Sequence, residues 1–252
     1  MALFRVSHPP AGATTLIVSL GIISQPKELV IIEVAVILLT AQAFAINRLA
    51  GIPYPLWRNH APSREGDGAM GNFDNQHPWE LCTTLTVGAW GYQPKVKIKT
   101  RDDVIRLLVG AVGRDGNLLL NVGPRPDGQI DPAQADRLRE IGDWLRLYGQ
   151  SIYATRGGPY LPGDFGVSTY RDKVIYLHIL NSIDTTLTLP GLPAKVLECS
   201  VLTGGAAKCL QTLSGLSVTL TDTPDAADTI VVLTLGSAAG EIKPIATTDT
   251  GK

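Results

Sequence analysis

The stretch Leu107–Gly128, LLVGAVGRDGNLLLNVGPRPDG, carries the clearest fold signal in the sequence. It starts on the apolar face of an expected helix, breaks at Arg114-Asp115-Gly116 and continues as the apolar run Asn117–Val122. Three consecutive leucines in that run are typical of a strand buried on both faces, as in a parallel sheet. A helix followed by a buried strand and a turn-rich loop predicts a βα unit.

The residues around this stretch extend the same pattern. Thr100 before Asp102 and Asp103 predicts the start of a helix that runs to Arg114. Asp131-Pro132, with Gln134 at the capping-box position, predicts a second helix that ends at Gly149. On the other side, Trp79–Trp90 is rich in Thr and Val and predicts a short strand. The long segment Ile52–Pro78 reads as an irregular loop of the kind that is usually functional.

After Gly157 the pattern changes to short strands separated by Asn, Gly, Pro and Asp, which is typical of an antiparallel sandwich. The expected strands are Lys173–Leu180, Thr185–Leu189, Lys195–Leu202, Ala207–Leu213, Leu216–Leu220 and Thr229–Leu235. We therefore predict an α/β region over residues 1–155, an antiparallel β-sandwich over 156–238 and a flexible tail over 239–252.

Composition excludes several classes of function. The chain has 252 residues and a net charge of −1, and it has no basic excess that would attract nucleic acid. Its three cysteines are scattered and predict no disulfide framework, and its four histidines are far apart. We therefore expect no metal and no cofactor.

The first fifty residues contain two apolar runs, Thr15–Ile23 and Leu29–Ala45. The second run has 17 residues and includes Glu33, so it is only marginally long enough to cross a bilayer. We interpret both runs as buried strands and a core helix and expect no membrane partner; a membrane tether through Leu29–Ala45 is the alternative. The weak secretory pattern slightly favours a cytoplasmic location.

Three stretches together resemble the α-L-fucosidases of glycoside hydrolase family 29. They are Phe73–Tyr92 (FDNQHPWELCTTLTVGAWGY), the opening stretch Leu107–Gly128, and Leu138–Pro159 (LREIGDWLRLYGQSIYATRGGP). The resemblance covers about residues 47–235. It implies the C-terminal half of a (β/α)₈-like barrel, with its site at the carboxyl ends of the strands, followed by a β-sandwich. It also implies hydrolysis of terminal α-L-fucosyl groups from oligosaccharides or glycoconjugates, with retained configuration.

A retaining glycosidase needs two carboxyl groups, one as nucleophile and one as general acid/base. The family's nucleophile is an Asp located a few tens of residues before an Asn-Asp-Arg-like motif, which Ile46-Asn47-Arg48 resembles here without its Asp. The preceding region, residues 1–27, contains no Asp or Glu, and Glu33 lies in no matching context. The nucleophile segment is therefore missing from this sequence.

The resemblance implies three candidates for the acid/base and leaves the choice among them open. The spacing to Gly71 favours Asp67, whereas the residue type favours Glu65. Alternatively, both are solvated loop carboxylates with no catalytic role. Glu80 is a further candidate, although we expect it to be a structural partner near the mouth of the barrel.

The same resemblance implies four substrate-binding residues. Arg48 would bind sugar hydroxyls through its fork of donors, unless it forms a surface ion pair. Trp90 would pack against the fucose C5 methyl, unless it is an ordinary core tryptophan. Trp57 and His60 would line a leaving-group subsite.

Two hypotheses of different classes follow. The first is an active, unusually short α-L-fucosidase that has an unorthodox nucleophile or a site completed by another subunit. The second is a catalytically inactive fragment that acts as a carbohydrate-binding or structural module. A truncated or frame-disrupted product would be such a fragment. A partial barrel would expose strand edges, so we also expect a homo-oligomer or a replacement built by the first fifty residues.

Overall fold

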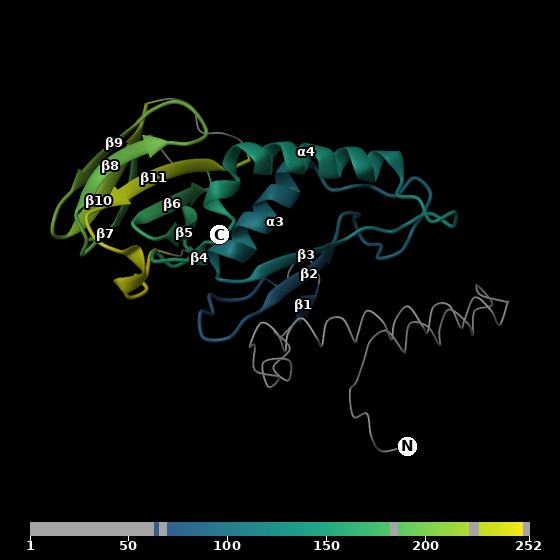
Figure 1. Cartoon of the computed structure of the whole chain (residues 1–252), viewed down its shortest axis with the longest axis horizontal. Helices are drawn as coiled ribbons and strands as arrows, with labels where there is room; N and C mark the ends of the chain where they lie inside the picture. Colours follow the sequence, from purple (N-terminus) through teal and green to yellow (C-terminus); the bar gives the residue numbers. More distant parts are fainter. Residues whose placement is uncertain (1–62, 66–69, 182–185, 222–226, 249–252) are drawn as a thin grey trace, which may run out of the picture. The chain divides into compact units, whose positions relative to one another are not determined.

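The computed structural model describes residues 63–65, 70–181, 186–221 and 227–248, and within 63–65 the side chain of Arg64 alone (Figure 1). These residues form one parallel sheet, two helices and two antiparallel sheets. The two apolar runs of the first fifty residues, including the alternative membrane tether, lie outside the described residues.

The parallel sheet has the order β1-β2-β3. Its strands are β1 (Ser63–Glu65), β2 (Glu80–Thr84) and β3 (Asn117–Asn121). Helices α3 (Arg101–Gly113) and α4 (Pro132–Tyr148) follow β2 and β3 respectively. The predicted βα units are therefore present, with parallel pairing between β2 and β3. Within this sheet, β1 was not expected, because it forms inside the segment that the sequence predicted to be irregular.

Helix α3 begins at the predicted cap. The Thr100 hydroxyl accepts a hydrogen bond from the Asp103 backbone N–H at 3.1 Å, and the Asp103 carboxylate accepts one from the Thr100 N–H, also at 3.1 Å. The hydrogen bonds from Thr100, first from its side chain and then from its backbone, lower the pKa of Asp103 below its usual value. Because the folded-state pKa is the lower one, this contribution is present near neutral pH. It is lost as the pH falls through the folded-state pKa of Asp103.

Replacing Thr100 by Ala should lower the free energy of unfolding by about 1 kcal/mol, which is the typical cost of losing a threonine cap. The loss should shrink in acid, where protonated Asp103 no longer supports the capping box. Urea unfolding of both proteins at neutral and at acidic pH measures this difference. An equal loss at both pH values would show that the carboxylate contributes nothing to the cap.

The antiparallel part has a three-stranded sheet, in the order β7-β10-β9, and a five-stranded sheet, in the order β4-β5-β6-β11-β8. The strands are β4 (Arg156–Gly157), β5 (Gly166–Arg171), β6 (Val174–Ile179), β7 (Thr186–Pro190), β8 (Val196–Val201), β9 (Ala207–Gln211), β10 (Gly215–Leu220) and β11 (Thr229–Leu235). The six predicted strands correspond to β6–β11, whereas β4 and β5 were not predicted.

One hydrophobic core is built from both antiparallel sheets. Leu187 of β7 and Leu216 of β10 lie in the same buried cluster as Leu177 of β6 and Leu233 of β11. Alternate residues of β7 and β10 are buried, as expected for strands with one face in a core.

Strand β6 is buried on both faces, which explains its nearly continuous apolar sequence. Leu177 contributes to the core shared by the two antiparallel sheets. Tyr176, the neighbouring residue, packs instead in a cluster with Ile105 of α3 and Trp144 of α4. The five-stranded sheet therefore carries the sandwich core on one face and the two helices on the other.

A disulfide joins Cys199 of β8 to Cys209 of β9, so it links the two antiparallel sheets. The sequence prediction of no disulfide framework is wrong at this pair. Each of the two strands lies at the edge of its sheet, and the disulfide joins these two edges. A sequence with three cysteines does not show which strands will be neighbours.

Reducing this disulfide, or replacing both cysteines by Ser, should lower the free energy of unfolding by about 2–3 kcal/mol. The estimate is the loop-closure entropy for a sequence separation of 10 residues. Urea unfolding with and without a thiol reductant measures the loss, and Cys82→Ser is the matched control because Cys82 takes no part in this disulfide. Equal stability in oxidised and reduced samples would show that the cross-link does not stabilise the fold.

Residues 239–248 are held to the rest of the structure, in contrast to the flexible tail predicted from their polar composition. A short 3-10 helix, η3 (Ala239–Glu241), begins at the buried residue Ala239. Farther along, the Ile245 backbone pairs with Tyr160, and the Leu161 N–H donates to the Ile245 carbonyl at 2.8 Å. These backbone hydrogen bonds are long-range contacts that composition cannot reveal. The domain limits at residues 155 and 238 remain predictions.

Candidate active site

The two faces of the parallel sheet differ in what covers them. Leu81 of β2 and Leu118 of β3 pack with Ala111 of α3 in a hydrophobic cluster. On the opposite face, Cys82 of β2 and Leu119 of β3 line an open hollow of about 700 Å³. The remaining residues of this hollow are Trp90, Leu120, Asn121 and Val122. A partly apolar hollow at the carboxyl end of parallel strands is the usual place for a ligand in β/α proteins.

Trp90 lies in the loop after β2, and its side chain is 47% exposed. This exposure does not fit the alternative reading of Trp90 as a core tryptophan. By comparison, Trp79 is fully buried and Trp144 is 5% exposed. An aromatic ring left half exposed beside a hollow is a surface on which the apolar side of a sugar can pack.

The loop that carries Trp90 is tied to the ends of both strands. The Asn121 Nδ2, at the end of β3, donates to the Trp90 carbonyl at 2.7 Å. The Thr84 hydroxyl, at the end of β2, donates to the Ala89 carbonyl at 3.2 Å. The Thr86 hydroxyl donates to the same carbonyl. The position of Trp90 is therefore set by side chains from neighbouring strand ends.

Sequence reasoning did not select Thr84 or Asn121. The signal that would have found them is their place at the carboxyl end of a strand, where an apolar run gives way to a polar side chain. In β/α folds this is where functional side chains concentrate.

Gly123 allows the backbone after β3 to approach the Trp90 loop. A Cβ at Gly123 would lie 2.6 Å from the Gly91 carbonyl carbon and 2.7 Å from the Tyr92 nitrogen. Both atoms belong to the backbone, so no side-chain rotation could relieve the contact. A glycine is therefore required here for the loop to lie beside the strand end.

Replacing Gly123 by Ala should displace the Trp90 loop and destabilise the fold by about 1–3 kcal/mol, the usual cost of overpacking. The control is Gly142→Ala on α4, because a Cβ there would have open space around it. Gly128→Ala would not serve, because Gly128 has a positive φ. Urea unfolding compares the two variants. A Gly123→Ala protein as stable as Gly142→Ala would contradict the close approach.

Glu80 is the first residue of β2, paired in register with Ser63 and Asn117. It lies four positions before Thr84, which corresponds to about 13 Å along an extended strand. Glu80 therefore lies at the amino end of β2, away from the hollow that Asn121 and Trp90 line, and its expected place near the mouth of a barrel stays a prediction. As a catalytic candidate Glu80 remains untested.

The other predicted site residues fall mostly outside the described structure. Arg48, Trp57, His60 and Asp67 lie outside the described residues. Glu65 lies in β1, where its backbone pairs with Cys82, and nothing is described of its side chain. Of the predicted residues, Trp90 alone is placed at the hollow by the described part of the chain.

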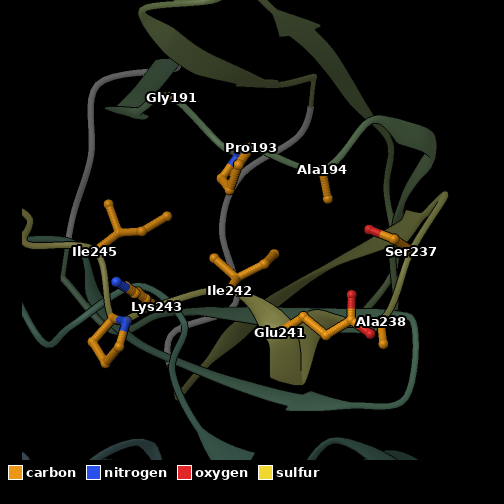
Figure 2. Close-up of a pocket in the computed structure, with 10 residues that line it drawn as sticks. Gly191, Pro193, Ala194, Ser237, Ala238, Glu241, Ile242, Lys243 and Ile245 are labelled. Carbon is orange, nitrogen blue, oxygen red and sulfur yellow. The ribbon is translucent and has the colours of Figure 1, made fainter.

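A second hollow, of about 590 Å³, lies in the antiparallel part (Figure 2). Figure 2 shows Pro193 and Ala194 on one side, with Ile242 and Glu241 on the other. Its lining contains no aromatic side chain on which a sugar ring could stack. The Trp90 hollow is therefore the better candidate for carbohydrate.

Among the described residues, no group of three or more His, Cys, Asp or Glu side chains is arranged to hold a metal ion. In the same part of the chain, no helix is both long and apolar enough to span a membrane.

Comparison with known proteins places these observations in a class. Residues 63–150, which contain the parallel sheet, α3 and α4, match the family model described as Alpha-L-fucosidase. The mouse tissue alpha-L-fucosidase is 40% identical over 83 residues, which is 32% of this chain and 18% of that protein. The human plasma alpha-L-fucosidase is 34% identical over 108 residues, covering 40% and 23% respectively.

Solved structures of the same class share the fold. Alpha-L-fucosidase isoenzyme 1 from Paenibacillus thiaminolyticus has a TM-score of 0.60 at 31% identity, covering 69% of this chain and 45% of that one. A GH29 alpha-L-fucosidase from Bacteroides thetaiotaomicron has a TM-score of 0.58 at 25% identity, covering 64% and 39%.

The fold of the described residues thus matches part of the fold of solved glycoside hydrolases. More narrowly, residues 63–150 match the alpha-L-fucosidase family model, and the similar proteins and solved structures named above are alpha-L-fucosidases. The chain spans about a fifth of the length of these curated relatives. The resemblance inferred from the three sequence stretches is confirmed.

Proposed function

We propose that this chain forms part of a retaining α-L-fucosidase that binds a terminal α-L-fucosyl group in the Trp90 hollow. The observation that carries the proposal is the half-exposed Trp90 ring, anchored to Asn121 at the carboxyl end of a parallel strand. The surrounding barrel, expected from the family resemblance, is part of the proposal. Fucosylated oligosaccharides or glycoconjugates are the proposed substrates.

The retaining mechanism has support from a relative. The Bacteroides thetaiotaomicron enzyme was trapped as a covalent intermediate in complex with 2-fluoro-fucosyl fluoride. A covalent glycosyl-enzyme intermediate is the mark of retention, because one carboxylate attacks the anomeric carbon and water later displaces it. We extend this mechanism to the present chain, with its acid/base among Glu65, Asp67 and Glu80 and with the attacking carboxylate supplied by an unorthodox residue of this chain or by another subunit.

The role given to Trp90 makes the site selective for a 6-deoxy sugar. L-Galactose differs from L-fucose by a hydroxyl on the C5 substituent, and that hydroxyl would be desolvated against the indole ring without a partner. An aryl α-L-fucoside should therefore be hydrolysed faster than the matching α-L-galactoside by about tenfold or more.

Trp90→Ala should remove most of this preference by raising the KM for the fucoside. Trp144→Phe, a change in the helix core, is the control and should keep the preference. Initial rates with both aryl glycosides measure the ratio. An unchanged ratio in Trp90→Ala would place the fucose methyl elsewhere.

The second candidate function is an inactive module that binds carbohydrate or has a structural role. It is favoured by the sequence of residues 1–27, which holds no Asp or Glu. This alternative predicts weak fucose binding or none, and no hydrolysis. Titration calorimetry with fucose, beside the activity assay, separates the two functions.

The expected homo-oligomer also remains a proposal, tested by the mass of the purified protein in solution.

A further inference from the structure

Lys99 occupies an unusual place for a lysine, because its side chain is only 7% exposed. Its ammonium group donates hydrogen bonds to two backbone carbonyls, those of Thr84 and Thr86, the second at 3.1 Å. Lysine is rarely buried unless its charge is bound by polar partners. Here the described partners are the backbone at the end of β2, immediately before the Trp90 loop.

The same region joins the two ends of that loop. The Lys99 backbone N–H donates to the Leu85 carbonyl at 2.9 Å, and the Val87 N–H donates to the Lys97 carbonyl at 2.8 Å. Thr86 and Ile98 form an antiparallel bridge between these bonds. Residues 85–87 and 97–99 thus form the base of a loop that carries Trp90, and the Lys99 ammonium lies across this base.

Two groups of contacts therefore hold Trp90 in place. Asn121 and the hydroxyls of Thr84 and Thr86 fix the backbone on either side of the indole. Lys99 fixes the strand end from which the loop departs, through hydrogen bonds that are strengthened by its charge. Since the ammonium is buried, salt screens these bonds far less than it would screen a surface contact.

We propose that Lys99 is a positioning residue that sets the orientation of Trp90 in the hollow. The proposal rests on the proposed function, in which Trp90 packs against the sugar. The chemistry is a buried cation clamping two carbonyl groups, and Lys99 itself touches no substrate.

Lys99→Met tests the proposal because it keeps the apolar stem and removes the ammonium. The Trp90 indole N–H signal in a ¹H–¹⁵N NMR spectrum, assigned with Trp90→Phe, should shift or broaden. The signals of Trp79 and Trp144 should keep their positions. Lys99→Arg, which keeps the charge and several donors, should restore the Trp90 signal at least in part.

The cap variant Thr100→Ala is the matched control, because it removes a neighbouring helix cap without touching the carbonyls of Thr84 and Thr86. It should leave the Trp90 signal unchanged. If Lys99→Met loses stability as Thr100→Ala does and the Trp90 signal stays in place, Lys99 is purely structural and the proposal is overturned. If Lys99→Met does not fold, Lys99→Gln takes its place, since it removes the charge and shortens the reach to the carbonyls of Thr84 and Thr86, and the same two outcomes of the Trp90 signal decide.

Kinetics add a second readout. A contact with the fucose methyl exists before and during the reaction, so loosening it should raise KM about tenfold and leave kcat nearly unchanged. A loss confined to kcat would contradict the proposal. If no variant hydrolyses an aryl fucoside but the Trp90 signal moves in Lys99→Met, the proposed function fails while the positioning role stands.

Discussion

Replacing Asp228 by Ala is expected to lower the free energy of unfolding by about 3–5 kcal/mol, the cost of leaving a buried polar partner unmatched. The Asp228 carboxylate lies 2.6 Å from Nδ1 of His178, and both side chains are fully buried. Removing the carboxylate leaves the imidazole without this hydrogen bond in a space that excludes water.

The hydrogen bonds around His178 show why the loss should be large. The Thr169 hydroxyl donates its single hydrogen to the Ser151 carbonyl at 2.7 Å. His178 Nε2, 3.2 Å from the same hydroxyl, must therefore be the donor in that contact. Nδ1, 2.6 Å from the Asp228 carboxyl oxygen, makes the second hydrogen bond of the same buried imidazole.

This hydrogen-bonded chain crosses the junction between two parts of the fold. Ser151 belongs to the 3-10 helix η2 (Gly149–Ser151) at the end of α4. His178 lies on β6, and Asp228 directly precedes β11. Breaking it therefore disturbs the packing of the helices on the five-stranded sheet.

The measurement is urea unfolding of Asp228→Ala beside Asp136→Ala. Asp136 forms an exposed ion pair with Arg139 on α4, with both side chains more than half exposed. Such pairs contribute at most about 0.5 kcal/mol, so this control should unfold almost like the parent. Asp228→Ala unfolding within about 1 kcal/mol of the parent would show that the buried pair does not stabilise the junction.

The second large effect concerns the general acid. One of the substitutions Glu65→Gln, Asp67→Asn and Glu80→Gln should lower kcat on an unactivated aryl fucoside by about 10²–10⁴-fold, the usual contribution of acid–base catalysis. Glu80 begins β2 and lies far from the carboxyl end of that strand, so its position argues against it.

The leaving group provides the diagnostic. A dinitrophenyl group departs without protonation, so the variant of the true acid should lose far less activity on a dinitrophenyl fucoside than on a phenyl fucoside. Asp143→Asn, an exposed carboxylate on α4, is the control and should behave like the parent. Uniform small losses in all three candidates would show that none of them is the acid.

Local signals in the sequence predicted much of the fold. Thr100 and Asp131 cap α3 and α4 as expected, because capping depends on residues only a few positions apart. The strand β3 followed from its run of leucines, but the predicted burial on both faces is wrong: none of its residues is fully buried, and Leu119, on the face that lines the hollow, is 49% exposed. In contrast, β5 (GVSTYR) has no apolar alternation, and its burial comes from packing between the antiparallel core and the helices.

Features that depend on distant contacts could not be predicted in this way. The Cys199–Cys209 disulfide and the attachment of Ile245 beside Tyr160 both require knowing which segments meet. In the site, the motif that contains Trp90 gave its residue type and place in the chain. Its exposure and its tie to Asn121 came from the pairing of β2 with β3.

The most direct test of the central claim is the hydrolysis of an aryl α-L-fucoside by the whole chain, followed by ¹H NMR. Turnover should release α-L-fucose as the first product anomer, because a retaining mechanism preserves the configuration at the anomeric carbon. Initial release of β-L-fucose would contradict retention. Absence of turnover at high protein concentration would contradict the assignment of fucosidase activity to this chain.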